Sequence, residues 1–368
     1  MTTTRGLSHK AVDLISKWRS VLPGSREEVG APEPPAAETQ PPCWDDQWSP
    51  DVYLEGYETR VWHMTHRPHL PEEGEGHLQA TLVRARPDQS HRAVLHIHGW
   101  NEYFFEDHLA RVWQDLGYDF YAIDLHRYGR SLQEGELPGY TDSITAYFDE
   151  IDAAVELIKQ THAQVVLSGH STGGLTSALW ADARPGQLVG LVLNSPWIDL
   201  QGSFLTRLLT PPIVKGLSSK APTVEMPKAE SDIYIRSLHQ AFGGEWSFDL
   251  ALKKPSSNPL RPGWLAAVVR AQDRVGEGLD IDVPILMALS ARSSDPKQFE
   301  DEDVKRTDIV LDVDLVAPRA SKLGWHVTLV RIEGGLHDIA LSAEPVRLRF
   351  FDEIRRWDAA YVAGPKAR

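Results

Sequence analysis

Cysteine is almost absent from this chain of 368 residues, in which Cys43 is the single example. One cysteine cannot form an internal disulfide, so the sequence favours a reducing compartment. No stretch approaches the roughly eighteen consecutive apolar residues that a membrane helix needs. The N-terminus has no basic flank followed by a continuous apolar run, so it does not resemble a secretory signal. We therefore expect a cytoplasmic protein without a transmembrane segment.

Positive charge is also scarce in the sequence. Lys and Arg number 38 against 52 Asp and Glu, which gives a net charge of −14. Proteins that bind nucleic acids concentrate basic residues on one face, and the sequence has no such cluster. We therefore expect no nucleic-acid partner. The composition, with 42% hydrophobic residues, is typical of a globular protein, and the chain is long enough to bury a full α/β core. The oligomeric state does not follow from the sequence.

Hydrophobic patterns divide the chain into an N-terminal arm, a core and an insertion. Residues 1–44 are expected to form a helix and a proline-rich arm. The core is expected to comprise residues 45–196 and 283–368. Residues 197–282 hold many prolines and glycines, scattered aromatic residues and no strong strand pattern, so they predict a cap inserted between two strands.

Strand-like and helical patterns alternate across the core. This alternation predicts a mostly parallel eight-stranded sheet with helices on both faces. A Pro/Gly-rich turn, rather than a helix, joins the first two strands, which should therefore be antiparallel. The strands are expected at 52–63, 78–85, 93–98, 119–123, 164–168, 189–194, 283–289 and 326–332, with helices at 104–116, 144–160 and 345–361.

The pattern Gly169-His170-Ser171-Thr172-Gly173 follows the apolar strand 164–168 and precedes a helical pattern. A serine on a tight strand-to-helix turn projects its hydroxyl away from the sheet, and flanking glycines let the backbone crowd together. The pattern predicts that Ser171 is a nucleophile. The amide of the next residue, Thr172, is then a candidate donor to the oxyanion of a tetrahedral intermediate.

A serine hydroxyl is too weakly acidic to attack unaided, so the site needs a base and an acid that orients it. His337 is the best candidate base, because it follows a late strand and a glycine-rich turn. The acid should lie between the preceding strand and this histidine. Asp308 is the first choice, with Asp295 second and Asp312 third.

A second oxyanion donor should come from the loop after an early strand. Strand 93–98 leads into His98-Gly99-Trp100, and the amide of Trp100 is the best candidate. His98 is expected to shape this loop by hydrogen bonding rather than to act as a base.

Two groups of histidines have the spacing of possible metal ligands. They lack carboxylates or cysteines at a fitting distance in the sequence, so we interpret them as ordinary surface or strand histidines and expect no metal. These groups are His63, His66 and His69, and the pair His96 and His98.

Several motifs together resemble the serine aminopeptidase (S33) and monoacylglycerol lipase-like branch of the α/β-hydrolases, over about residues 45–362. The resemblance implies an α/β-hydrolase fold, a Ser-Asp-His triad of Ser171, Asp308 and His337, an oxyanion hole and no metal or cofactor. The matching motifs are His98-Gly99 with Glu102, Asp124-Leu125-His126-Arg127-Tyr128-Gly129-Arg130-Ser131, Gly169 to Gly173, Ser195-Pro196-Trp197 and Gly335-Leu336-His337-Asp338.

The sequence departs from this family at two places. The family's acid usually follows its strand within a few residues, whereas seventeen residues, 291–307, precede Asp308. The family's usual Arg-Gly-His-Gly is His126-Arg127-Tyr128-Gly129 here.

These features predict a serine hydrolase that cleaves a carboxylic ester, of the carboxylesterase or monoacylglycerol lipase/lysophospholipase type. The aromatic residues of the cap, with Trp100, Tyr103 and Phe104 near the oxyanion donor, predict an apolar pocket for a small-molecule or lipid-like ester. The alternatives are an acyltransferase or an aminopeptidase that uses the same triad, and a non-catalytic ligand-binding protein of the same fold.

Overall fold

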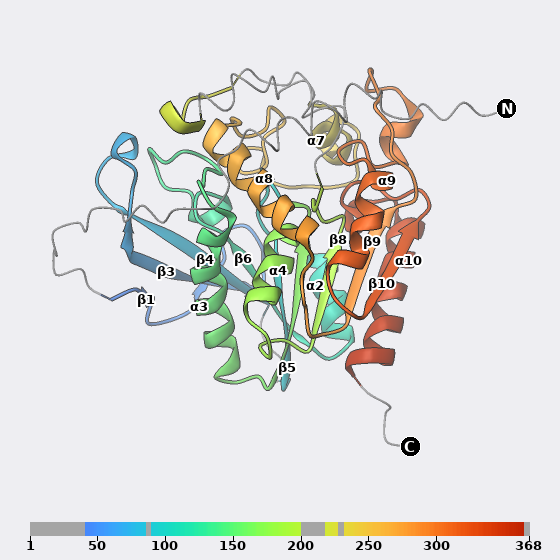
Figure 1. Cartoon of the computed structure of the whole chain (residues 1–368), viewed down its shortest axis with the longest axis horizontal. Coiled ribbons are helices and arrows are strands. Elements are labelled where there is room, and N and C mark those ends of the chain that lie inside the picture. Colours follow the sequence, from blue (N-terminus) through green and yellow to red (C-terminus); the bar gives the residue numbers. More distant parts are fainter. Residues whose placement is uncertain (1–40, 86–89, 200–217, 227–231, 364–368) are drawn as a thin grey trace.

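The structure, a computed structural model, describes residues 41–85, 90–199, 218–226 and 232–363 (Figure 1). Most of the predicted N-terminal arm, residues 1–40, and part of the predicted cap, residues 200–217 and 227–231, lie outside the described residues. Among the helices of the described part, none combines the length and the apolar character needed to cross a membrane.

The described residues form one sheet of ten strands. The sheet runs through the molecule (Figure 1). Its order is β1-β3-β4-β6-β5-β7-β8-β9-β10, and β2 pairs with β3. Eight of these strands correspond to the eight predicted ones, and the other two, β1 and β2, contain two residues each. The strands are β1 (Cys43–Trp44), β2 (Ser49–Pro50), β3 (Tyr57–Pro68), β4 (His77–Ala85), β5 (Arg92–Ile97), β6 (Asp119–Asp124), β7 (Gln164–His170), β8 (Gly190–Asn194), β9 (Ile285–Ser290) and β10 (Val327–Ile332).

The sheet is mostly parallel. Strands β6, β5, β7, β8, β9 and β10 pair in parallel, whereas β4 is antiparallel to both β3 and β6. The predicted antiparallel start is therefore confirmed. The strand order reverses at β5, because the chain next adds β6 on one side of it and then β7 on the other. Such a switch point opens a crevice at the carboxyl ends of the two strands, which is where open α/β sheets place their sites.

The first long strand begins later than predicted. The prediction was 52–63, but β3 spans Tyr57–Pro68. Gly56 has a φ of 83°, and the amide of Asp51 donates to the carbonyl of Tyr57 at 2.9 Å. This turn closes the preceding residues into a loop, so the extended pairing starts only after Gly56.

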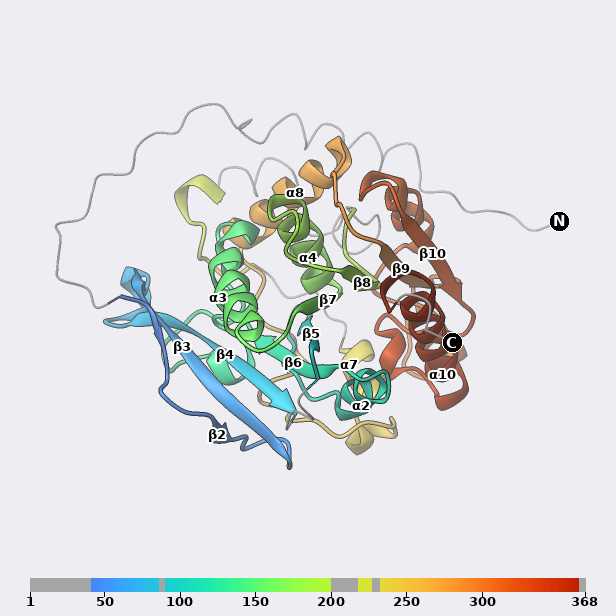
Figure 2. The ribbon, with the colours of Figure 1, turned by 90° about the horizontal axis from the view of Figure 1, so that it is seen from below.

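Helices cover both faces of the sheet (Figure 2). Helices α3, α4 and α8 contribute to one large apolar cluster, and α2 and α10 contribute to a second cluster on the opposite face. The helices are α2 (Asp107–Asp115), α3 (Phe148–Lys159), α4 (Thr172–Ala183), α7 (Ile233–Leu238), α8 (Pro262–Glu277), α9 (Val313–Val316) and α10 (Glu344–Trp357). Short helical turns are η1 (Pro71–Glu73), η2 (Gly129–Ser131), η3 (Ile144–Tyr147), η4 (Gln240–Phe242), η5 (Glu302–Lys305), η6 (Ala317–Lys322), η7 (Ile339–Leu341) and η8 (Asp358–Val362).

Burial explains why these segments are helical. In α2 the buried side chains Leu109, Val112 and Trp113 recur at helical spacing and face the sheet. Helix α4 is buried on nearly all sides, because it lies between the sheet and α8. Its small residues permit this close packing.

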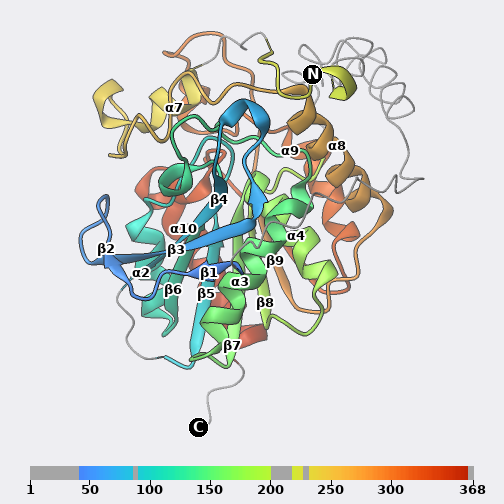
Figure 3. The ribbon, with the colours of Figure 1, turned by 90° about the vertical axis from the view of Figure 1, so that its left-hand side faces the viewer.

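The described part of the predicted cap lies above the carboxyl ends of the strands, with α7 near the top of the molecule (Figure 3). A third apolar cluster connects it to the loops below, through Ile235, Leu238 and Phe248 on the cap side and Tyr103 and Leu341 on the core side. Helix α8 falls inside the predicted cap range 197–282, but it packs against α4 in the main core. The division into arm, core and cap stays a prediction.

Candidate active site

Ser171 occupies the sharp turn between β7 and α4. Its backbone has φ 53° and ψ −116°, a strained conformation for a residue other than glycine. The neighbouring glycines permit this turn. A Cβ on Gly169 would lie 2.6 Å from the carbonyl oxygen of Gly173, and a Cβ on Gly173 would overlap the backbone of Ile97 and His98. Ser171 is therefore held at the carboxyl end of β7 by a backbone that larger flanking residues would not allow.

His337 lies between Ser171 and Asp308. Its Nε2 is 2.9 Å from Oγ of Ser171, and its Nδ1 is 3.0 Å from Oδ2 of Asp308. A carboxylate only accepts hydrogen bonds, so Nδ1 donates to Asp308, and Nε2 of the neutral imidazole accepts from the serine hydroxyl. The three side chains are buried, with Ser171 the most exposed at 6%. They form one hydrogen-bonded chain at the carboxyl ends of three strands.

Asp308 lies within hydrogen-bond distance of His337 although seventeen residues separate it from β9 in the sequence. Its amide donates to the carbonyl of Arg292 at 3.0 Å, and the amide of Ser294 donates to the carbonyl of Asp308 at 3.1 Å. The intervening residues are therefore an excursion that returns to the end of the strand. Oδ1 of Asp308 accepts from the amides of Val310 at 2.8 Å and Leu311 at 2.7 Å. These two bonds fix the orientation of the carboxylate.

The two alternative acids have other surroundings. Asp295 is exposed and forms an ion pair with Lys297. Asp312 is the N-cap residue of α9. Of the three candidates, it is Asp308 whose carboxylate is hydrogen-bonded to His337.

The loop after β5, residues 98–104, passes directly beside Ser171; we call it the oxyanion loop. A Cβ on Gly99 would lie 3.0 Å from Cβ of Ser171 and 2.8 Å from Oε2 of Glu102, so the close approach requires glycine. Trp100 is the next residue of this loop. Thr172 is the first residue of α4, and the first amides of a helix have no acceptor within it. Both predicted donor residues are therefore near Ser171. Thr172 follows it in the sequence, and Trp100 follows Gly99, which packs beside Ser171.

His98 holds the oxyanion loop in place. Its Nδ1 donates to the carbonyl of Gly99 at 2.8 Å, and its Nε2 accepts from the amide of Leu125 at 3.1 Å. Burial lowers the pKa of His98, which favours the neutral imidazole that this pattern requires. The prediction that His98 shapes the loop is confirmed.

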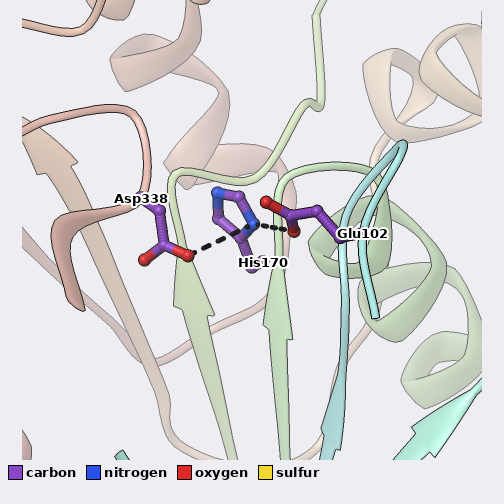
Figure 4. Close-up of side chains that lie close together, drawn as sticks. All are labelled: Glu102, His170 and Asp338. Atoms are coloured by element: carbon purple, nitrogen blue, oxygen red, sulfur yellow. Dashed lines mark hydrogen bonds and ion pairs between the residues drawn. The ribbon is translucent and has the colours of Figure 1, made fainter. Parts of the chain in front are cut away.

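A second group of buried polar side chains includes His170, the residue before Ser171 (Figure 4). Oε2 of Glu102 accepts from Nδ1 of His170 at 2.8 Å and from the amide of Gly99 at 2.8 Å. Oδ2 of Asp338 lies 3.7 Å from the same Nδ1. Lys253, from the predicted cap, forms an ion pair with Oε1 of Glu102. Two carboxylates therefore face one ammonium group and one imidazole.

Mutual attraction sets the charges in this group. Burial raises the pKa of Glu102, but Lys253 and His170 outweigh burial and hold that pKa well below its usual range. Burial lowers the pKa of His170, but Asp338 and Glu102 outweigh burial and raise it. Glu106 differs, because burial and the two neighbouring carboxylates together raise its pKa well above the usual range. Burial and these carboxylates therefore stabilise the protonated form of Glu106 relative to that of a free carboxyl group.

Glu102, His170 and Asp338 are residue types that bind metals, and one ligand atom from each lies within 4.8 Å of the others. The set does not fit a divalent cation as it stands, because Lys253 and the imidazole already compensate the carboxylates, and Glu102 is bonded directly to His170. The absence of a metal stays a prediction. The three spaced histidines each contact a separate carboxylate, in the pairs His63–Asp45, His66–Asp149 and His69–Glu136.

Arg127 stands where the family resemblance leads to an expectation of glycine. Its φ is 63°, a left-handed conformation that is unusual for arginine. Its Nε donates to Oε1 of Glu73 at 2.6 Å and its Nη2 to Oε2 at 2.5 Å, and both residues are buried. His126 forms a further buried pair with Glu150. The departure from the family motif therefore coincides with buried ion pairs that hold this turn.

Aromatic rings from the core and from α8 meet beside the oxyanion loop. The ring of Trp100 packs on that of Trp264 with centroids 3.9 Å apart, and Trp264 lies 6.0 Å from Trp197. A small pocket lies beside Trp264 and Thr172. Its lining is mostly apolar and comprises His98, Gly99, Leu125, Tyr128, Ile144, Tyr147, Thr172, Gly173, Thr176 and Trp264.

The prediction that Phe104 lies on the pocket side is wrong. Successive side chains of the loop point in different directions. Tyr103 packs in the cluster beneath the cap, whereas Phe104 packs against Tyr57 and Phe120 in the core on the far face of the sheet.

Sequence reasoning missed Lys253. In the sequence it is one of two adjacent lysines in a segment without a regular pattern, which usually indicates a solvated loop. Its partner Glu102 is 151 residues away. Glu102, the acceptor, belongs to the motif that begins at His98-Gly99. No local pattern in the sequence indicates that Lys253 is its donor.

Comparisons with known proteins agree with this architecture. Residues 88–292 match the family model described as serine aminopeptidase, S33. Phospholipase YtpA of Bacillus subtilis (strain 168) is 30% identical over 118 residues, which are 32% of this chain and 44% of that protein. The chain thus spans less than half the length of this relative.

Two solved structures share the fold. The monoacylglycerol lipase of Paleococcus ferrophilus has a TM-score of 0.55 and 20% identity, covering 72% of this chain and 92% of that one. A soluble variant of monoglyceride lipase from Saccharomyces cerevisiae, in complex with a substrate analog, has a TM-score of 0.55 and 18% identity, covering 89% and 98%. The family match extends over more than half of the chain, and the two solved structures share its fold. The chain therefore belongs to the serine aminopeptidase S33 family of α/β-hydrolases.

Proposed function

We propose that this hydrolase cleaves carboxylic esters through an acyl-enzyme, with Ser171 as nucleophile, His337 as general base and Asp308 as the acid that orients the base. The observation that carries the proposal is the hydrogen-bonded chain from Asp308 through His337 to Ser171, with contacts of 3.0 Å and 2.9 Å. A nucleophile, its base and an orienting group within hydrogen-bond reach are what serine catalysis requires.

In the proposed reaction, Oγ of Ser171 attacks the ester carbonyl as its proton passes to Nε2 of His337. The developing oxyanion accepts hydrogen bonds from the amides of Trp100 and Thr172. Collapse of the tetrahedral intermediate breaks the bond to the alcohol, which leaves with the proton from His337. Water then attacks the acyl-enzyme, with the same imidazole as base, and releases the carboxylic acid and the free serine. Asp308 stays ionised and holds Nδ1 in the protonated tautomer.

We propose an apolar, lipid-like ester as the substrate. The aromatic group of Trp100, Trp197 and Trp264 beside the oxyanion loop supports this, because rings of this kind bind acyl chains or ring-bearing groups. The name of the relative, phospholipase, and those of the two lipases of the same fold are consistent with such a substrate. The predicted cap, residues 197–282, would then cover the acyl group. The cytoplasmic location stays a prediction.

A panel of p-nitrophenyl esters of rising chain length, compared with aminoacyl amides, tests the proposal. We expect turnover of the esters, with kcat/KM rising with chain length. Turnover of the amides alone would instead support an aminopeptidase. Product transfer to an added alcohol would support an acyltransferase. Absence of covalent labelling by a fluorophosphonate would support a non-catalytic binding protein.

A further inference from the structure

Segment 249–257 of the cap is joined to the oxyanion loop by successive polar contacts. The amide of Asp249 donates to Oη of Tyr103 at 2.7 Å, and Nδ2 of Asn101 donates to the carbonyl of Lys254 at 2.9 Å. Nε1 of Trp100 donates to Oγ of Ser257 at 3.1 Å. The loop that carries the proposed oxyanion donor is thus fixed from the cap side residue by residue.

Lys253 is the charged contact in this series. Its side chain is 0% exposed, and its ammonium group pairs with Oε1 of Glu102. Three aromatic rings also surround the ammonium group, with centroids 5.6 Å away for Phe105, 5.8 Å for Phe248 and 6.0 Å for Tyr234. A fully buried lysine is unusual and is stable only when its charge is compensated, as it is here.

Glu102 transmits this contact to the site. Its other oxygen accepts from the amide of Gly99, where an added Cβ would lie 3.0 Å from Cβ of Ser171. The same oxygen accepts from His170, the residue before Ser171 (Figure 4). One carboxylate therefore connects the cap lysine to both sides of the nucleophile. A shift of this carboxylate moves the oxyanion loop relative to Ser171.

We propose that Lys253 is a positioning residue for catalysis: it holds Glu102, and through Glu102 it sets the distance between the oxyanion loop and Ser171. This inference rests on the proposed function. Ester turnover then depends on docking of segment 249–257, and the cap contributes to the chemical step as well as to substrate binding.

Replacement of Lys253 by a neutral residue leaves His170 as the remaining group that lowers the pKa of the buried Glu102 carboxyl. Its pKa then rises, because burial is no longer opposed by the ammonium group. Protonation of Glu102 weakens its bond to the Gly99 amide, so the acid limb of the kcat profile moves to higher pH. The other titratable groups that interact electrostatically with Glu102 are His96 of β5, His98 of the oxyanion loop, Glu106, Tyr128, His170 of β7, Tyr234 of α7 and Asp338.

The test compares the full-length wild-type protein with Lys253→Met, using p-nitrophenyl butyrate and rates per site titrated with a fluorophosphonate. Removing one oxyanion donor costs about 10²- to 10³-fold in kcat, so a displaced donor should cost about 10- to 100-fold, with KM changed less than about threefold. Lys305→Met, at an exposed lysine, is the matched control and should keep the wild-type kcat. A purely structural role would lower the number of titratable sites and leave kcat per site and its pH profile unchanged.

A second variant, Asn101→Gly, probes the same docking of segment 249–257 and is used if Lys253→Met fails to fold. Asn101 has a φ of 57°, which glycine adopts easily, and its removal leaves no buried charge. It breaks the docking contact to Lys254, so kcat should fall several-fold at unchanged KM and without a shift of the acid limb. Wild-type kcat per site in both variants, or in the one that folds, would overturn the role of Lys253. A wild-type protein without ester turnover would overturn the proposed function and this inference with it.

Discussion

Replacement of Asp308 by asparagine tests the part of the site that the sequence left most open. The side-chain oxygen of asparagine still accepts from the amides of Val310 and Leu311, which lie 2.8 Å and 2.7 Å from Oδ1. Its NH2 group then occupies the place of Oδ2, 3.0 Å from Nδ1 of His337. Two donors cannot bond to each other, so the imidazole changes tautomer and places its hydrogen on Nε2. In that form it cannot accept the proton of Ser171.

The expected loss follows from this tautomer. A triad with asparagine in place of its aspartate loses about 10⁴-fold in kcat, which corresponds to about 5.5 kcal/mol of transition-state stabilisation. The fold should be retained, because the two amide hydrogen bonds that orient the side chain remain. We therefore expect an unchanged thermal midpoint to within a few degrees.

The assay is hydrolysis of p-nitrophenyl butyrate by Asp308→Asn, with Asp295→Asn as the matched control. The control changes an exposed carboxylate that forms an ion pair with Lys297, and it should retain activity within about twofold because exposed ion pairs contribute little. A loss of less than about tenfold in Asp308→Asn, or an equal loss in the two variants, would refute the assignment, since the tautomer effect in a triad is about 10⁴-fold.

Three further variants test the surrounding structure. Gly169→Ala would place a Cβ 2.5 Å from Oγ of Ser177 and should lower the free energy of unfolding in urea by about 1–3 kcal/mol; an unchanged midpoint would contradict the crowded turn. Glu106→Gln tests a pKa that burial raises above 4.5: the folded wild type binds the extra proton, so its free energy of unfolding falls as pH rises above that value. Glutamine removes this dependence, and the variant should gain thermal stability relative to wild type as pH rises above 4.5; parallel pH profiles would count against it. Trp264→Ala removes a ring that is 2% exposed and should cost about 3–5 kcal/mol in the same urea experiment; a loss under about 1 kcal/mol would mean that the ring is not part of the core.

Local patterns were sufficient to predict the strands and most helices, because burial on a sheet or helix face repeats within a few residues. The elbow at Ser171 was predictable for the same reason, since strand, glycines and helix are adjacent in sequence. The start of β3 was not, because a left-handed turn at Gly56 replaced extended backbone. The direction of Phe104 was also missed, because it depends on how the loop twists after Gly99.

Contacts between distant segments were beyond prediction from the sequence. Asp308 was the first of three choices, and its approach to His337 depends on the excursion that returns its backbone to Arg292. The buried pair of Lys253 and Glu102 had no local signal, because a lysine becomes buried only when folding supplies its counter-charge.

Mass spectrometry after treatment with a fluorophosphonate tests the central claim most directly. The reagent forms a covalent adduct with a serine whose hydroxyl is activated by a neighbouring base. We expect one adduct per chain, on the peptide that contains Ser171, and no adduct in Ser171→Ala or after denaturation. An unmodified wild-type protein, or an adduct that persists in Ser171→Ala, would contradict it.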